Sequence, residues 1–209
     1  MSDDGAGSEP NRNTDSTDDT DADADDETDI RPIQEHDWPV LDSAVEYETG
    51  WYTGGYDEVR QPDGSTKRYY WAELPAAVVV VAVADGDLIM VDQYRPAIAK
   101  QCLELPAGIV EEGESPTTAA ARELREETGF DPAGCAVLES MWCATGVLRH
   151  RRIHVFAEGL EPVERKLDGN EFIRVRRVPV DDALAVARRE PTNDATLEGI
   201  LLARAEGLL

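Results

Sequence analysis

Lysine and long apolar runs are both scarce in this chain. Only three of its 20 basic residues are lysine, whereas aspartate and glutamate number 44, so the formal net charge is −24. Such a negative charge argues against nucleic-acid backbones and anionic membranes as partners. No apolar run approaches the roughly 20 residues that span a membrane, and nothing near Met1 resembles a signal peptide. We therefore expect no nucleic-acid partner and no membrane partner.

Cysteine is also rare. Cys102, Cys135 and Cys143 are odd in number, widely spaced and set among apolar residues. This arrangement has no zinc-ligand spacing and favours free thiols in a reducing compartment. An acidic, lysine-poor composition is typical of proteins that work at very high salt, where self-repulsion is screened. The sequence therefore predicts a cytoplasmic protein from a salt-adapted lineage.

Charge and aromatic content divide the chain into three parts. Residues 1–29 contain twelve acidic residues and one arginine without apolar periodicity, which predicts a disordered acidic tail, either solvating or regulatory. Residues 30–74 contain most of the aromatic rings and are expected to form a small antiparallel β subdomain, with strands over 45–60 and 65–71. The rings serve either core and cross-strand packing or an interface. Residues 75–209 should form the main domain.

The main domain alternates apolar strands with later helical patterns. Strands are expected over 76–83, 88–94, 102–105, 136–142, 153–157 and 172–178. Residues 181–189 and 194–206 have helical periodicity, with Asp181 and Asp194 as expected N-caps and Gly207 as a stop. Helices that can cover both faces of such a sheet predict an α/β sandwich.

A short helix with defined ends lies in the segment 108–130, GIVEEGESPTTAAARELREETGF. Ser115 is a suitable N-cap for a helix whose first turn contains Pro116, and Gly129 can end it in a left-handed conformation. Ala120 and Leu124 are four positions apart and supply the apolar side that packs the helix down.

Three glutamates share another side of this helix. Glu126 and Glu127 follow Glu123 by three and four positions, so their carboxylates are neighbours. At about 5 Å and an effective dielectric constant near 20, each pair repels by roughly 3 kcal/mol. Hard cations such as Mg²⁺ relieve this repulsion and are commonly shared with the phosphates of a substrate. The alternative is a solvated acidic face.

The complete pattern favours the metal site. It comprises Gly108, Glu114, Arg122-Glu123-Leu124, Glu126-Glu127 and Gly129-Phe130 at fixed offsets. At typical usage of about 7% each, even seven of these nine identities coincide by chance only on the order of 10⁻⁸ times per start position. The segment resembles, at every defined position, the signature of the Nudix hydrolases, which cleave nucleoside diphosphates linked to another moiety.

Flanking segments narrow the resemblance to ADP-ribose pyrophosphatases. They are residues 93–96 (QYRP), 103–108 (LELPAG), 170–173 (NEFI) and 194–196 (DAT). The resemblance covers about residues 45–207. It implies an α/β/α sandwich with a mixed sheet, and a homodimer formed through the N-terminal β subdomain, with both chains shaping the base-binding site.

The resemblance also implies the metal ligands. Glu123, Glu126, Glu127 and the carbonyl of Ala107 would bind Mg²⁺, with Mn²⁺ as the alternative. Gly108, which lacks a Cβ, would let the backbone approach the substrate closely.

Further site residues are implied around this centre. Glu114 and Arg122 would form an ion pair between loop and helix, and an additional Arg122–Glu126 pair does not exclude it. Arg95 would hold a phosphate, with an ordinary surface arginine as the alternative. Glu104 would face the cleft and orient, by hydrogen bonding, the groups that bind metal or substrate directly.

A catalytic base is implied in the acidic loop 161–171. Glu171 matches best, with Asp168 and Glu164 as rivals. One departure concerns residues 144–146, where Thr145 stands at the position at which these pyrophosphatases have proline. The adjoining segment 148–152 is unusually basic, and it would contact phosphates or pair with acids elsewhere.

These observations leave three functions. The first is Mg²⁺-dependent hydrolysis of a nucleoside diphosphate sugar, with ADP-ribose giving AMP and ribose 5-phosphate. The second is hydrolysis of another sugar nucleotide, a dinucleotide or a damaged nucleoside triphosphate. The third is a regulatory Nudix-fold module that binds a nucleotide without catalysis.

Overall fold

The computed structural model describes residues 38–167, 169 and 172–209. Residues Trp38–Leu209 form one compact unit. The acidic tail expected over 1–29 lies outside the described residues, and the subdomain boundary expected near residue 74 stays a prediction. No helix in the described part is both long enough and apolar enough to cross a membrane.

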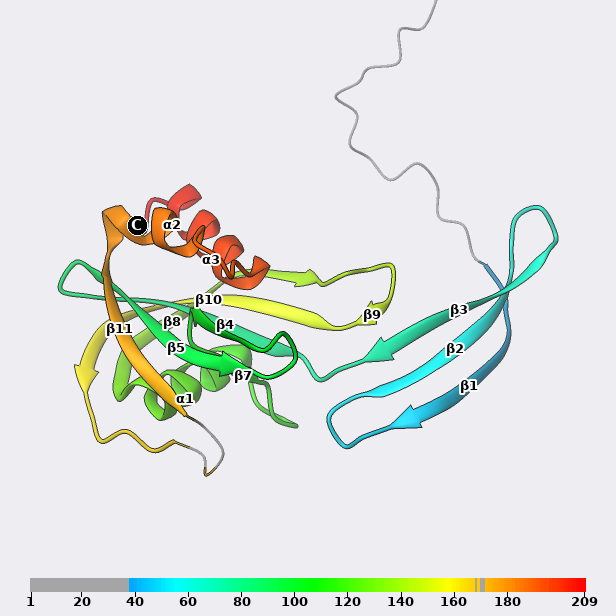
Figure 1. The fold of residues 1–209 in the computed structure, drawn as a ribbon, viewed down its shortest axis with the longest axis horizontal. Helices are drawn as coiled ribbons and strands as arrows, with labels where there is room; N and C mark the ends of the chain where they lie inside the picture. Colours follow the sequence, from blue (N-terminus) through cyan, green and yellow to red (C-terminus); the bar gives the residue numbers. More distant parts are fainter. Residues whose placement is uncertain (1–37, 168, 170–171) are drawn as a thin grey trace, which may run out of the picture. The chain divides into compact units, whose positions relative to one another are not determined.

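A seven-stranded mixed sheet forms the centre of the main domain (Figure 1). Its strand order is β11-β5-β4-β10-β8, while β6 pairs with β5 and β7 with β4. Strands β10 and β4 are parallel, and the other pairs are antiparallel. The strands are β4 (Ala77–Ala84), β5 (Asp87–Arg95), β6 (Lys100–Glu104), β7 (Ala107–Ile109), β8 (Phe130–Trp142), β10 (Arg151–Pro162) and β11 (Ile173–Pro179).

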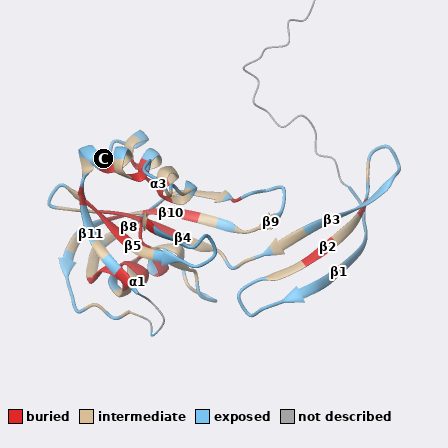
Figure 2. Cartoon of the chain, in the orientation of Figure 1, coloured by how far each residue is buried: buried red, intermediate tan, exposed pale blue. Residues whose placement is uncertain are grey.

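Helices cover both faces of this sheet. Helix α1 (Pro116–Thr128) lies on one face, and α2 (Val180–Ala187) and α3 (Asp194–Ala205) lie on the other (Figure 1). Alternate residues of β4 point to the two faces: Val78 and Val80 pack with Leu124 of α1, whereas Val79 and Val81 pack with Ile200 of α3. The core is concentrated in these layers (Figure 2). The expected α/β/α sandwich is therefore confirmed.

The two ends of α1 agree with the sequence. The Ser115 hydroxyl accepts the N–H of Thr118 at 3.2 Å, and Gly129 adopts a φ of +75°. A Cβ at Gly129 would also lie 3.1 Å from the carbonyl oxygen of Val163. Ala120 and Leu124 are fully buried. The two caps therefore define a helix that contains the three glutamates of the sequence pattern.

The expected caps of α2 and α3 are wrong. Pro179 precedes α2, and no side chain caps that helix, so Asp181 lies within its first turn. Asn193, one residue before Asp194, caps α3 by accepting the N–H of Thr196. Both aspartates instead contribute negative charge to the first turn, where it complements the helix dipole. Gly207, with a φ of +70°, follows α3 as expected.

The single strand expected over 45–60 is also wrong. This stretch belongs to two antiparallel strands, β1 (Val40–Glu48) and β2 (Thr53–Arg60). The reversal has a local cause, because the Thr49 hydroxyl accepts the N–H groups of Trp51 and Tyr52 while Gly50 adopts a φ of +82°. The alternation of apolar residues on either side concealed the turn.

A second sheet of four strands has the order β1-β2-β3-β9, where β3 spans Thr66–Glu73 and β9 spans Leu148–Arg149. The short β9 pairs in parallel with β3, opposite Ala72 and Glu73. Tyr56 is buried, but the rest of this sheet carries many exposed aromatic side chains (Figure 2). Trp51 is 68% exposed and Tyr70 57%, so most of these rings are not core residues.

Candidate functional site

The acidic face of α1 lies directly against strand β7. Glu123 and Glu127 are buried, while Glu126 is partly exposed. Glu127 Oε2 accepts the backbone N–H of Ala107 at 3.1 Å. A Cβ added to Gly108 would lie 1.9 Å from the Glu123 carboxyl carbon. Any side chain at position 108 would therefore displace the Glu123 carboxylate from its present position.

Arg122 connects this face with the preceding loop. Its Nε and Nη2 donate to the two oxygens of Glu114 at 3.1 and 3.0 Å. Its Nη1 donates to Glu123 at 2.7 Å and to Glu126 at 3.1 Å. The loop-to-helix pair and the i,i+4 pair thus occur together. The hydrogen bonds from Arg122 lower the pKa of Glu114, and those to Glu114 and Glu123 raise the pKa of Arg122 although burial opposes this.

The donor chemistry around α1 fits a hard divalent cation. Within the described ranges no three histidine, cysteine or acidic side chains already form a metal-binding cluster. Glu123 and Glu126 bond Arg122, and Glu127 bonds Ala107. The available donors are nevertheless carboxylate and carbonyl oxygens, which Mg²⁺ prefers over nitrogen or sulfur. Among them, the Glu123 carboxylate occupies the space that a Cβ at Gly108 would take.

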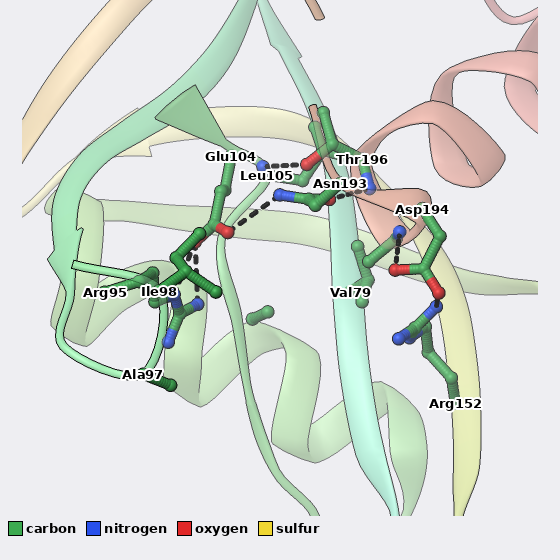
Figure 3. Close-up of a pocket in the computed structure, with 12 residues that line it drawn as sticks. Val79, Arg95, Ala97, Ile98, Glu104, Leu105, Arg152, Asn193, Asp194 and Thr196 are labelled. Carbon is green, nitrogen blue, oxygen red and sulfur yellow. Dashed lines mark hydrogen bonds and ion pairs between the residues drawn. The ribbon is translucent and has the colours of Figure 1, made fainter. Parts of the chain in front are cut away.

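A pocket of about 300 Å³ opens beside Ala107 (Figure 3). At its edge, the buried Glu104 carboxylate accepts bonds from Gln93, Arg95 and Asn193 at 2.7–3.0 Å. Arg95 and Glu104 thus form an ion pair within the pocket. The lining residues come from the strands β4, β5, β6, β7 and β10, the β5–β6 and β6–β7 links and the start of α3. They are Val79, Arg95, Ala97, Ile98, Glu104, Leu105, Ala107, Arg152, Asn193, Asp194, Ala195 and Thr196.

Two arginines of the basic segment 148–152 pair with acids in this structure. Arg149 forms an ion pair with Asp57 and stacks on the Trp71 ring, 3.9 Å from its centroid. Arg152 pairs with Asp194 at 3.1 Å and with Glu198 at 3.0 Å. These arginines therefore connect parts of the fold, and Arg152 also borders the pocket.

His154 was not among the residues expected from the sequence. It is fully buried on β10, with Nε2 3.1 Å from the carbonyl oxygen of Ala195. Its Nδ1 has no hydrogen-bond partner in the described part of the chain. Burial lowers the pKa of His154, although the Ala195 carbonyl and Glu198 partly oppose this. The sequence signal that could have identified it is a single histidine within an apolar strand.

The structure describes only some of the site residues that the sequence predicted outside α1. Glu171 and Asp168 lie outside the described residues, and Glu164 is exposed. Arg95 and Glu104 are brought together in the pocket next to Ala107. Asn193 was missed, because its importance depends on Glu104, which is 89 positions away in the chain.

Comparisons with known proteins agree with this arrangement. The family model of the NUDIX domain matches residues 73–198. An ADP-ribose pyrophosphatase from Bacillus subtilis (strain 168) is 36% identical over 66% of this chain and 77% of its own length. A methanol dehydrogenase activator from Bacillus methanolicus is 34% identical over the same shares of both chains.

A solved structure described as an ADP compounds hydrolase shares the fold. It superposes with a TM-score of 0.76 and 22% identity, and the match covers 85% of this chain and 100% of that one. The family match spans more than half of the chain and includes α1, β7 and the pocket residues. The chain therefore belongs to the NUDIX domain family and is a Nudix hydrolase.

Proposed function

We propose that this enzyme hydrolyses the diphosphate bond of a nucleoside diphosphate sugar in a Mg²⁺-dependent reaction, and that ADP-ribose is its substrate, giving AMP and ribose 5-phosphate. The contact of the α1 glutamates with the Ala107–Gly108 backbone carries the proposal. The activity named for the Bacillus subtilis relative supports this substrate. The Bacillus methanolicus relative, of similar identity, is named as a methanol dehydrogenase activator and not as an ADP-ribose pyrophosphatase. A substrate panel is therefore the decisive test.

Metal binding is assigned to Glu123, Glu126, Glu127 and the carbonyl of Ala107. A bound divalent ion supplies charge stabilisation at phosphorus and lowers the pKa of water, with Mn²⁺ as the substitute for Mg²⁺. Arg122 and Glu114 have a positioning role, because Arg122 bonds the loop and two of the carboxylates at once. Gly108 keeps the backbone open to the substrate.

Substrate contacts and proton transfer involve residues outside α1. Arg95 is assigned to a phosphate, because part of its guanidinium faces the pocket while Glu104 holds the rest. Glu104 supports Arg95 from the pocket wall. Glu171 is assigned as the general base, with Asp168 and Glu164 as alternatives, since this acidic stretch of the sequence precedes β11.

A homodimer is proposed from the exposed sheet β1-β2-β3-β9. Val45, Tyr47, Trp51 and Tyr70 are all at least 57% exposed, and contiguous exposed apolar side chains commonly mark protein interfaces. A concentration series by light scattering should give a dimer mass, and Tyr70→Glu should shift the protein toward monomer. We place the enzyme in the cytoplasm of a salt-adapted cell, since its three cysteines are free and its net charge is −24.

The substrate panel should contain ADP-ribose, other sugar nucleotides, dinucleotides and nucleoside triphosphates, assayed at high salt with Mg²⁺, Mn²⁺ or EDTA. We expect ADP-ribose to have the highest kcat/KM and EDTA to abolish turnover. Equal or better turnover of triphosphates would refute the proposed substrate. Thr145, in place of the proline of ADP-ribose pyrophosphatases, favours another sugar nucleotide or a dinucleotide as the second candidate.

A further inference from the structure

The buried carboxylate of Glu104 is bonded on both oxygens. Its Oε2 accepts Gln93 Nε2 at 3.0 Å and Arg95 Nε at 2.8 Å, and it forms an ion pair with Arg95 Nη2 at 2.7 Å. Its Oε1 accepts Asn193 Nδ2 at 2.7 Å. Asn193 thus bonds Oε1, whereas both contacts from Arg95 are to Oε2 (Figure 3).

Asn193 has two separate contacts. Its Oδ1 accepts the N–H of Thr196 at 2.8 Å and caps α3, while its Nδ2 reaches Glu104. Thr196 Oγ1 in turn accepts the N–H of Leu105 at 3.1 Å. The first turn of α3 is therefore tied to the end of β6 at two neighbouring positions. This closed ring of hydrogen bonds fixes the carboxylate that holds Arg95.

The outer part of the Arg95 guanidinium faces the pocket. Its side chain is 45% exposed, and Nη1 donates no hydrogen bond to any of the described residues, whereas Nε and Nη2 bond Glu104. If the bond to Asn193 were lost, Oε1 would compete for Arg95, because an arginine and a carboxylate favour two parallel bonds. The guanidinium would then turn toward Glu104 and away from the pocket.

We infer that Asn193 is a positioning residue for substrate binding: it occupies one oxygen of Glu104, so that Arg95 presents its free N–H groups to a phosphate of the substrate. This inference rests on the proposed function, in which Arg95 contacts a phosphate. It assigns to Asn193 a role beyond capping α3.

Asn193→Ser separates the two roles. Serine is an equally good N-cap but is too short to reach Glu104. We expect this variant to melt within a few degrees of the wild type, with a KM for ADP-ribose raised about tenfold, because a charge-assisted contact is weakened. Its kcat should stay within about threefold, since the chemistry at α1 is untouched. Asn193→Thr provides a second capped variant, and Asn193→Ala should lower both Tm and substrate affinity.

A matched control is available in the preceding residue. Thr192 is exposed, and its hydroxyl bonds only the carbonyl of Arg189 among the described residues, so Thr192→Ala should retain the wild-type KM. The route through Arg95 is tested by a double-mutant cycle with Arg95→Ala. In that background Asn193→Ser should raise KM by less than about twofold, since the residue through which it acts is absent.

Dissociation constants for ADP-ribose and inorganic pyrophosphate in EDTA separate this inference from the proposed function. A wild type that binds pyrophosphate about tenfold more tightly than Asn193→Ser but does not bind or hydrolyse ADP-ribose would refute the substrate and support the role of Asn193. Equal affinities of wild type and Asn193→Ser for both ligands, or additive effects with Arg95→Ala, would overturn that role.

Discussion

Glu127 Oε2 accepts the backbone N–H of Ala107 at 3.1 Å, although the two residues are 20 positions apart. This bond holds α1, which carries the acidic residues, against β7. The backbone of β7 is proposed to contact the metal and the substrate. Ala107 itself is held in β7 by pairing with Val79. Helix and strand are therefore joined directly into one structural unit.

Replacing Gly108 should disrupt this unit. In Gly108→Ala the new Cβ would lie 1.9 Å from the Glu123 carboxyl carbon, so the carboxylate has to move. We expect kcat/KM to fall on the order of 100-fold and the free energy of unfolding to fall by about 1–3 kcal/mol. Gly146→Ala is the control, because a Cβ there meets nothing within 4 Å. Wild-type turnover in Gly108→Ala would refute a role for Glu123 in the site.

Glu127→Gln should separate charge from structure. The amide oxygen can still accept the N–H of Ala107, so the free energy of unfolding should change by less than about 1 kcal/mol. Loss of the negative charge should lower Mg²⁺-dependent kcat at least about 100-fold. The exposed Glu112 offers the matched control Glu112→Gln, which should keep full activity. If Glu127→Gln retained its turnover, the metal assignment would be wrong.

Stability should decrease on mild acidification because of His154. Burial lowers its pKa in the folded state, so the unfolded chain binds the proton more readily. The contribution is complete above the ordinary histidine pKa of about 6.5 and is lost as pH falls through that value toward the folded-state pKa. The groups facing the ring are Arg152, Asp194 and Glu198.

The measurement is Tm between pH 8 and pH 5.5 in His154→Gln and in the wild type. Each kcal/mol corresponds to about 2–4 °C at this chain length. The wild type should lose more Tm than the variant over this range. His150→Gln is the control, since its ring is only partly buried and bonds the carbonyl of Pro75. Parallel curves for wild type and His154→Gln would exclude this histidine as the cause.

Salt should stabilise the folded enzyme. With a net charge of −24, repulsion among surface carboxylates is reduced as the Debye length shortens from about 10 Å at 0.1 M to about 3 Å at 1 M. We expect Tm to rise by about 5 °C or more between 0.1 and 2 M KCl. Sucrose at matched osmolality controls for solute exclusion. A Tm that is constant or falls in KCl would contradict the salt-adapted assignment.

Local signals explain which parts of the fold the sequence could predict. The helix between Ser115 and Gly129 and the apolar strand β4 depend on caps and periodicity within a few residues. The Thr49–Gly50 turn was missed because residues 45–60 were expected to form one continuous strand. The Asn193 cap was missed because the adjacent Asp194 was expected to be the N-cap.

The sequence by itself determined the acidic face of α1, the glycine beside it and the family that uses them, because all of these depend on spacing within 23 residues. Only the tertiary structure decided that Glu104 meets Asn193 across 89 positions and that His154 is sealed beneath α3. Such contacts follow from how sheet and helices pack together. A carboxylate or an imidazole has no local periodicity that reveals its distant partner.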